Sequence, residues 1–224
     1  MVDNELIIQA FKKFIIGLII VAALIFAPAG TLNYPNGWLF MALLFFPMFV
    51  VGIILMIKSP DLLERRLNGK EDESEQKAVV LISGVMFLSA FILAGLNYRF
   101  NWNRLPESIV ILSSIIFLIA YALYGEVLRE NRYLARTVKV ESSQKVIDTG
   151  LYGIVRHPMY TATIFLFLTI PLILGSVYSF IIFLIYPVLI SFRIKNEEMV
   201  LEKELEGYVE YKRKVKYRVL PYVW

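Results

Sequence analysis

The sequence contains no cysteine and only one histidine among its 224 residues. The first absence excludes disulfides, a thiol nucleophile and a thiolate metal site. The second leaves too few imidazoles for a histidine-cluster metal centre, so no metal is expected. Charge is scarce as well: Asp, Glu, Lys and Arg make up 19% of the chain, whereas a soluble domain has about a quarter.

Hydrophobic residues take the place of the missing charge. They form 58% of the chain and are gathered in blocks. A helix needs about 20 apolar residues to cross the hydrocarbon core of a bilayer. Six blocks approach that length, at about residues 14–29, 38–57, 78–96, 109–128, 159–174 and 177–192. The sequence therefore predicts an all-α, polytopic membrane protein with about six transmembrane helices.

The last two blocks are separated only by Gly175 and Ser176. So short a connection predicts a helical hairpin, in which the two helices are antiparallel neighbours. After Phe192 the chain continues as "RIKNEEMVLEKELEGYVEYKRKV", in which one stripe is formed by Ile194, Leu201, Leu205, Tyr208 and Lys212. This pattern predicts an amphipathic C-terminal helix that continues out of the sixth span. A simple alternative role for it is a basic helix that anchors to anionic lipid.

Lysine and arginine are divided unevenly between the two sides of such a bundle. With six crossings, 21 of the 23 basic residues fall on one side, and only Arg99 and Arg104 fall on the other. Basic loops stay in the cytoplasm, so both termini are expected there. One alternative is that Lys12, Lys13 and the apolar run up to "APAG" (residues 27–30) form a cleavable signal peptide. Five spans with the same orientation would then remain.

The only histidine lies in "GLYGIVRHPMY", residues 150–160. A residue before proline avoids the helical region, and proline is favoured in the first turn of a helix. The fifth span is therefore expected to begin at about Pro158, with His157 just outside it. Unpaired backbone N–H groups and the positive end of the helix dipole face that position, which makes it a seat for a carboxylate or phosphate. Arg156 adds a positive charge, and Tyr160 lies in the first turn.

The hairpin brings a second polar group to the same place. Arg193, Glu197 and Glu198 follow the point where the sixth span leaves the membrane, and Arg193 and Glu197 share one helical face. Alone, this pair is most simply a helix ion pair. Because the hairpin places "RHPMY" beside "RIKNEE", we predict one pocket with an anion seat on one wall and paired carboxylates on the other. Such a pocket suits a zwitterion that carries an amino group and a carboxylate.

Together these two segments resemble the C-terminal signature of the isoprenylcysteine carboxyl methyltransferases. These enzymes belong with the phospholipid methyltransferases in a group of membrane enzymes that use S-adenosylmethionine (SAM). The resemblance runs from about Thr137 to Trp224. It divides the chain into a scaffold of four spans, residues 1–136, and a catalytic region, residues 137–224. Many members have a glycine shortly after the motif tyrosine, where this chain has Thr161 and the small Ala162.

The resemblance implies roles for particular residues. Arg193 and Glu197 would lie at the reaction centre. SAM would be held by Tyr152, Val155, Arg156, His157, Pro158, Tyr160, Glu197 and Glu198. Methyl transfer from a sulfonium needs alignment and charge control. Arg193 would bind a carboxylate acceptor or organise Glu197, whereas an amine acceptor would need Glu197 as a base.

Two further segments are expected near the cofactor. The tail from Tyr208 to Trp224 is expected to fold back as a lid. The long connection before the fifth span is expected to pack under the cofactor through Val138, Val140 and Gln144. Near the end of the fourth span, Glu126, Arg129 and Glu130 are interpreted as helix-end ion pairs, with a role in the pocket as the alternative.

The expected function is that of a membrane methyltransferase which takes SAM from the cytoplasm and a lipophilic or prenylated acceptor from the bilayer. The carboxyl group of an isoprenylcysteine is the first candidate acceptor, and a phospholipid amine is the alternative. Membrane lipids are expected partners, and nucleic acid is not. Two other classes stay open. One is an NADPH-dependent membrane reductase, whose C-terminal end is partly similar, and the other is a non-enzymatic membrane protein whose tail only binds anionic lipid.

Overall fold

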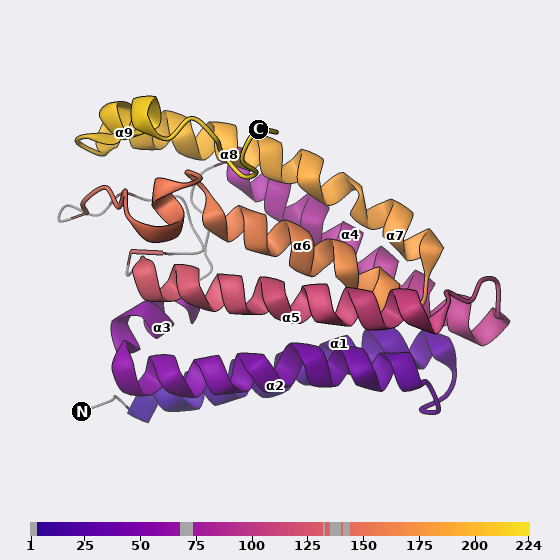
Figure 1. Cartoon of the computed structure of the whole chain (residues 1–224). Coiled ribbons are helices and arrows are strands. Elements are labelled where there is room, and N and C mark those ends of the chain that lie inside the picture. Colours follow the sequence, from indigo (N-terminus) through magenta and orange to yellow (C-terminus); the bar gives the residue numbers. More distant parts are fainter. Residues whose placement is uncertain (1–3, 68–73, 132, 135–139, 141–143) are drawn as a thin grey trace.

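A computed structural model gives the fold of the protein and describes residues 4–67, 74–131, 133–134, 140 and 144–224. Thr137 and Val138, which entered the predictions above, lie outside these residues. Every regular element in the described part is a helix (Figure 1). The elements are α1 (Asn4–Ala29), α2 (Pro35–Lys58), α3 (Pro60–Leu67), α4 (Ser74–Phe100), α5 (Glu107–Glu130), the 3₁₀ turn η1 (Gly150–Gly153), α6 (Pro158–Ile173), α7 (Val177–Phe183), α8 (Ile185–Glu204) and α9 (Tyr208–Lys214).

Five helical segments are long and apolar enough to cross a membrane, namely α1, α2, residues 77–100 of α4, α5, and α7 together with α8. The all-α membrane fold predicted from the sequence is therefore confirmed. The block expected to be the fifth span forms α6, which has only 16 residues. At 1.5 Å per residue it is about 24 Å long, which is less than the roughly 30 Å hydrocarbon core.

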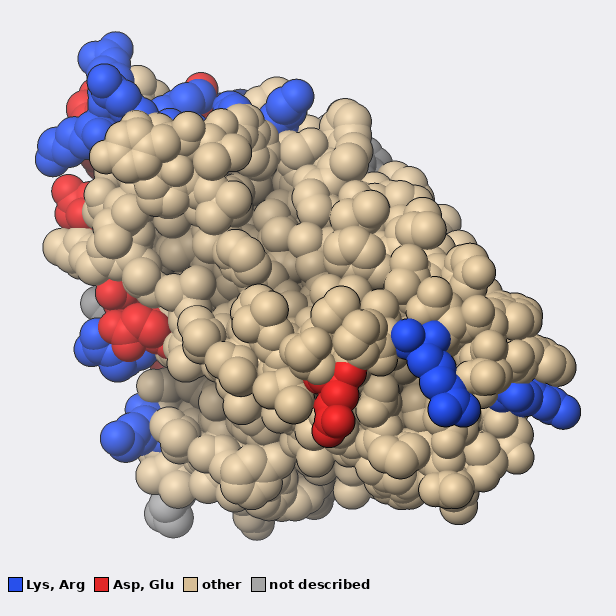
Figure 2. Space-filling view, turned by 45° about the vertical axis from the view of Figure 1, so that its right-hand side comes forward, with Lys and Arg blue, Asp and Glu red and all other residues tan. Residues whose placement is uncertain are grey.

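The short helix α6 lies inside the bundle, where it contacts α2, α4, α5, α7 and α8. Ala162, Ile170 and Ile173 on it are almost completely buried. Protein rather than lipid surrounds much of α6, so its ends do not have to reach the bilayer surface. The outer helices differ, because many of their large apolar side chains are exposed, such as Phe46 at 71% and Leu81 at 69%. Figure 2 shows the resulting broad uncharged surface, with charged groups gathered mainly at its left edge.

The hairpin between α6 and α7 has the tight turn expected from Gly175 and Ser176. Gly175 adopts a left-handed φ of +76°, and a Cβ there would lie 3.0 Å from the Asn36 side-chain nitrogen. The Ser176 side chain accepts a hydrogen bond from the Ser179 N–H at 3.2 Å and so caps α7. The hairpin prediction is confirmed.

The sixth span and the tail are less continuous than the sequence predicts. The span is divided at Leu184 into α7 and α8. Pro187 lies four residues after Phe183 and has no N–H to offer its carbonyl, which explains the break. The predicted tail helix is also divided, because α8 ends at Glu204 and Gly207 adopts a φ of +83° before α9 begins. The chain therefore turns back on itself instead of extending away from the bundle (Figure 1).

Candidate active site

The motif around the single histidine adopts the expected local structure. α6 begins at Pro158, and His157 is its non-helical N-cap, with φ −127° and ψ 62°. The C-terminal tail lies directly along this segment. The Arg156 N–H donates to the Tyr217 carbonyl at 2.9 Å, and the His157 N–H donates to the Arg218 carbonyl at 2.8 Å. Residues far apart in the sequence thus pair their backbones at the start of α6.

Arg156, which was predicted to add a positive charge beside an anion seat, has several partners within the protein. Its side chain is buried, and its Nε donates to Glu198 Oε1 at 2.7 Å. Its NH1 donates to the carbonyls of Val215 and Lys216 at 2.7 and 2.8 Å. These bonds tie α6, α8 and the tail together. The expected anion seat is therefore built differently, because tail carbonyls cover this part of the helix N-terminus.

Glu198 is the centre of a buried ion network. Its side chain is 3% exposed and lies close to four cationic or ionisable groups. Besides Arg156, the Arg218 guanidinium approaches its Oε2 at 3.0 Å, His157 Nε2 lies 3.3 Å from its Oε1, and Lys212 Nζ is 3.9 Å away. A buried carboxylate is tolerated only when it is paired in this way. Glu198 therefore joins α6, α8, α9 and the tail.

Glu197, the next residue, lies on the other side of this network and faces a cleft. Its side chain is 24% exposed, and its Oε1 lies 3.8 Å from His157 Nδ1. Tyr160 stands between Glu197 and Arg193: its hydroxyl donates to Glu197 Oε2 at 2.5 Å and accepts from Arg193 Nε at 2.9 Å. The hairpin thus brings the two predicted segments into direct contact, as the sequence analysis expected.

A third wall of the cleft is formed by η1. The Tyr152 hydroxyl accepts a hydrogen bond from Asn131 Nδ2 at 2.8 Å, and its carbonyl accepts one from the Tyr211 hydroxyl at 2.8 Å. Tyr152 is thereby held by the end of α5 and by α9 at once. Burial is the main cause that raises the pKa of the Tyr152 phenol, which therefore stays protonated at neutral pH.

Glu130 fixes the start of η1, and the sequence analysis did not single out this role. Its carboxylate accepts the Leu151 N–H at 3.0 and 3.2 Å. Gly150 has a φ of +55°, and a Cβ there would lie 1.8 Å from Glu130 Oε1. Nearby, Arg129 and Glu126 form the predicted surface ion pair at 2.5 Å. The glycine before Leu151 was the one signal in the sequence for such a close approach.

These elements line an open cleft, whose empty space is about 850 Å³ when the open solvent at its mouth is included. Of the predicted site residues, the cleft is lined by Tyr152, Arg156, His157, Tyr160, Arg193 and Glu197. Val155, Pro158 and Glu198 are buried outside the lining. Further lining residues that were not among the predicted site residues include Asn131, Tyr133, Met159, Leu201, Tyr208 and Tyr211.

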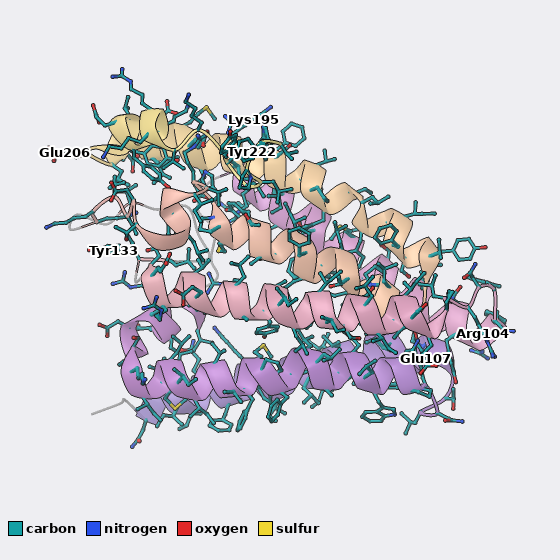
Figure 3. The ribbon with its side chains drawn as sticks, viewed as in Figure 1. Arg104, Glu107, Tyr133, Lys195, Glu206 and Tyr222 are labelled. Carbon is teal, nitrogen blue, oxygen red and sulfur yellow. The ribbon has the colours of Figure 1, made fainter. Side chains whose placement is uncertain are left out.

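The cleft lies at one end of the bundle. Figure 3 places Tyr133 and Glu206 at that end, and Arg104 and Glu107 at the other. Gln144 lines the cleft, and Val140 packs against the cluster that contains Tyr208. Within the part of the chain that the structure describes, no group of three or more His, Cys, Asp or Glu side chains comes together as a metal site requires.

Comparison with known proteins gives a match over part of the region that forms this site. No curated protein matches the chain. The family model of the phospholipid methyltransferases matches residues 108–206. The match includes α5, the hairpin, the RHP segment and Arg193–Glu198, and it ends just before α9. It confirms the resemblance recognised from the sequence: residues 108–206 match the model of the phospholipid methyltransferases, a family of integral membrane methyltransferases related to the isoprenylcysteine carboxyl methyltransferases.

Proposed function

We propose that the protein uses SAM to methylate a lipophilic acceptor drawn from the bilayer, and that the cleft holds the methyl donor. The observation that carries this proposal is the hydrogen-bonded set Arg193–Tyr160–Glu197 on the cleft wall. It places a cation and a carboxylate on one surface at the end of the spanning helices. The match to a family of membrane methyltransferases supports methyl transfer as the reaction.

The residues of the cleft fit a zwitterionic sulfonium compound. When bound, SAM supplies an electrophilic methyl group on a positively charged sulfur. Glu197 offers a carboxylate to the ammonium or the sulfonium, and Tyr152, Tyr160 and Tyr208 line the same cleft, where aromatic rings can attract positive charge. The reaction then requires mainly alignment of the acceptor with the methyl group.

The carboxyl group of an isoprenylcysteine is the first candidate acceptor. A carboxylate is nucleophilic as it stands, and the Arg193 guanidinium would orient it by charge-assisted hydrogen bonds. Arg193 itself is positioned by its bond to the Tyr160 hydroxyl. No general base is needed for this reaction, so Glu197 would serve the donor.

A phospholipid amine is the second candidate, supported by the description of the matching family. An ammonium group must lose a proton before it can attack, and a carboxylate in the cleft is the natural base. Glu197 is suited to this role, because its side chain is partly exposed to the cleft while Tyr160 fixes one of its oxygens.

Orientation and access follow from the same proposal. The cleft lies at the basic end of the bundle, so the positive-inside rule places it at the cytoplasmic face, where SAM is available. The acceptor would reach it from the side, between helices, because its tail prefers lipid. α9 acts as the lid: Tyr208 and Tyr211 line the cleft, and the Tyr211 hydroxyl holds the Tyr152 carbonyl.

Titration of the purified protein with SAM tests the proposal. We expect saturable binding and thermal stabilisation by SAM, and neither by NADPH. NADPH binding without SAM binding would indicate the reductase, and binding of neither would indicate a non-enzymatic protein. Labelled methyl transfer to farnesylated cysteine and to phosphatidylethanolamine then separates the acceptors, because a methyl ester is released by alkali and an N-methyl group is not. A chain that ends at Gly207 should lose SAM binding if α9 is the lid.

A further inference from the structure

The hydroxyl of Tyr208 is buried, and Tyr208 lines the cleft. The residue is 4% exposed, and its hydroxyl has no hydrogen-bond partner in the described structure. Buried polar groups in folded proteins almost always have a partner, so an exception at a site points to a group that the site receives. Tyr211, one turn further along α9, is also buried but donates to the Tyr152 carbonyl at 2.8 Å. The two tyrosines of α9 thus differ in whether the hydroxyl has a partner among the described residues.

The position of Tyr208 is fixed by its surroundings. Gly207, with a φ of +83°, sets the turn that directs α9 back to the cleft. The rings of Tyr208 and Tyr211 lie 5.7 Å apart. They belong to an apolar cluster with Leu205 and Val215, against which Val146 packs. The phenol is therefore held in place at the cleft wall rather than free to turn towards water.

The charges around this hydroxyl determine what it can bind. Burial raises the pKa of the Tyr208 phenol first, Glu198 and Glu197 raise it further, and Arg156 opposes them. The phenol therefore stays protonated and can donate. Glu198 is already paired with Arg156 and Arg218. Among the described residues that line the cleft, Lys145, Arg156 and Arg193 carry positive charge and Glu197 carries negative charge, and this excess of cations favours an anionic group on the ligand.

We propose that the Tyr208 hydroxyl donates a hydrogen bond to the carboxylate of the amino-acid part of the bound methyl donor. This inference rests on the proposed function and adds a residue that lies outside the family match, which ends at residue 206. Glu197 remains for the ammonium group of the same ligand. Tyr208 would thereby distinguish SAM from nucleosides that lack an amino-acid part.

The test compares Tyr208→Phe and Tyr211→Phe in the full-length protein. Isothermal titration uses two probes, SAM and 5′-methylthioadenosine, which keeps the nucleoside and sulfur but has no amino-acid part. For Tyr208→Phe we expect SAM to bind about tenfold more weakly, as for a lost hydrogen bond to a charged group, and methylthioadenosine to bind as it does to the wild type. Without ligand, its melting temperature should not fall, because no protein hydrogen bond is lost.

Tyr211→Phe is the matched control, because it removes the bond to the Tyr152 carbonyl and should lower the melting temperature of the ligand-free protein. Equal affinity of SAM for Tyr208→Phe and wild type would refute the role of Tyr208 and leave the proposed function standing. Equal weakening of both probes, or a lower melting temperature of ligand-free Tyr208→Phe, would show a structural role and also refute it. A wild type that does not bind SAM would refute the proposed function, and this inference with it.

Discussion

Glu198→Gln is expected to destabilise the protein by about 3–5 kcal/mol, the usual cost of removing one partner from a buried ion pair. The substitution keeps the size of the side chain and removes only its charge. Arg156 then remains in a buried position with no carboxylate at its Nε, which lies 2.7 Å from Glu198 Oε1 in the wild type.

The four groups around Glu198 contribute unequally to this loss. The Arg156 side chain is 5% exposed and dominates the cost, because a buried charge has little access to water. Arg218 is 25% exposed and Lys212 is 36% exposed. Water therefore screens their positive charges when the Glu198 carboxylate is removed, and their share of the cost is small. His157, whose Nε2 is 3.3 Å away, would face a neutral amide in place of the carboxylate.

Glu202→Gln is the matched control. Glu202 lies on the same helix, and its carboxylate pairs with Lys212 at the surface, where both side chains are more than a third exposed. Such a pair contributes at most about 1 kcal/mol. Thermal unfolding in detergent, followed by circular dichroism, measures both variants. If Glu198→Gln lowered the melting temperature no more than Glu202→Gln, the central place given to the buried network would be wrong.

Three other perturbations test the site. Gly150→Ala should lower stability by about 1–3 kcal/mol through a strained left-handed residue and a clash with Glu130, and a melting curve equal to that of the wild type would contradict this. Tyr160→Phe removes the hydroxyl between Arg193 and Glu197, and should slow single-turnover methyl transfer about 10- to 100-fold while SAM affinity changes much less. Alkaline pH should destabilise the fold. Burial raises the pKa of the Tyr152, Tyr208 and Tyr211 phenols above the usual 10, so these phenols lose their protons at lower pH in the unfolded chain than in the folded one. The free energy of unfolding therefore falls as pH rises past 10. A melting temperature that stays constant from pH 9 to 11 would contradict the last prediction.

The parts of the site that follow local rules could be predicted from the sequence. The residue before a proline avoids the helical conformation, so the start of α6 at Pro158 could be predicted. The two-residue connection at Gly175 predicted the hairpin. Because the hairpin is tight, residues near its two open ends had to meet, which gave the contact of Tyr160 with Glu197. These are consequences of backbone sterics and of short connections.

The partners of Arg156 could not be predicted in the same way. A guanidinium is satisfied equally by a ligand carboxylate, a side-chain carboxylate or backbone carbonyls, and the sequence does not tell which of these will lie beside it. The choice depends on where the tail runs, and that depends on the turn at Gly207. The role of Glu130 could not be predicted for a similar reason. Its partner Leu151 comes 21 residues later, and the sequence does not tell how the chain returns from one residue to the other.

The break in the sixth span could have been predicted from the sequence, which was instead interpreted as one continuous helix. Pro187 lies inside the predicted sixth span, and its lack of an N–H is sufficient to end α7 near Phe183. The burial of the short helix α6 could not be predicted from the sequence, because an apolar block of 16 residues has the same pattern whether protein or lipid surrounds it.

The backbone pairing between the tail and the RHP segment has a consequence for biogenesis. In the described part of the chain, the N–H groups of Arg156 and His157 donate to the carbonyls of Tyr217 and Arg218. A nascent chain cannot form these bonds while Tyr217 and Arg218 are still inside the ribosome. The helices would enter the bilayer first, and the pocket that we propose for the methyl donor would form afterwards, when the tail folds at the membrane surface. Ribosome-stalled intermediates should therefore be inserted but unable to retain the methyl donor.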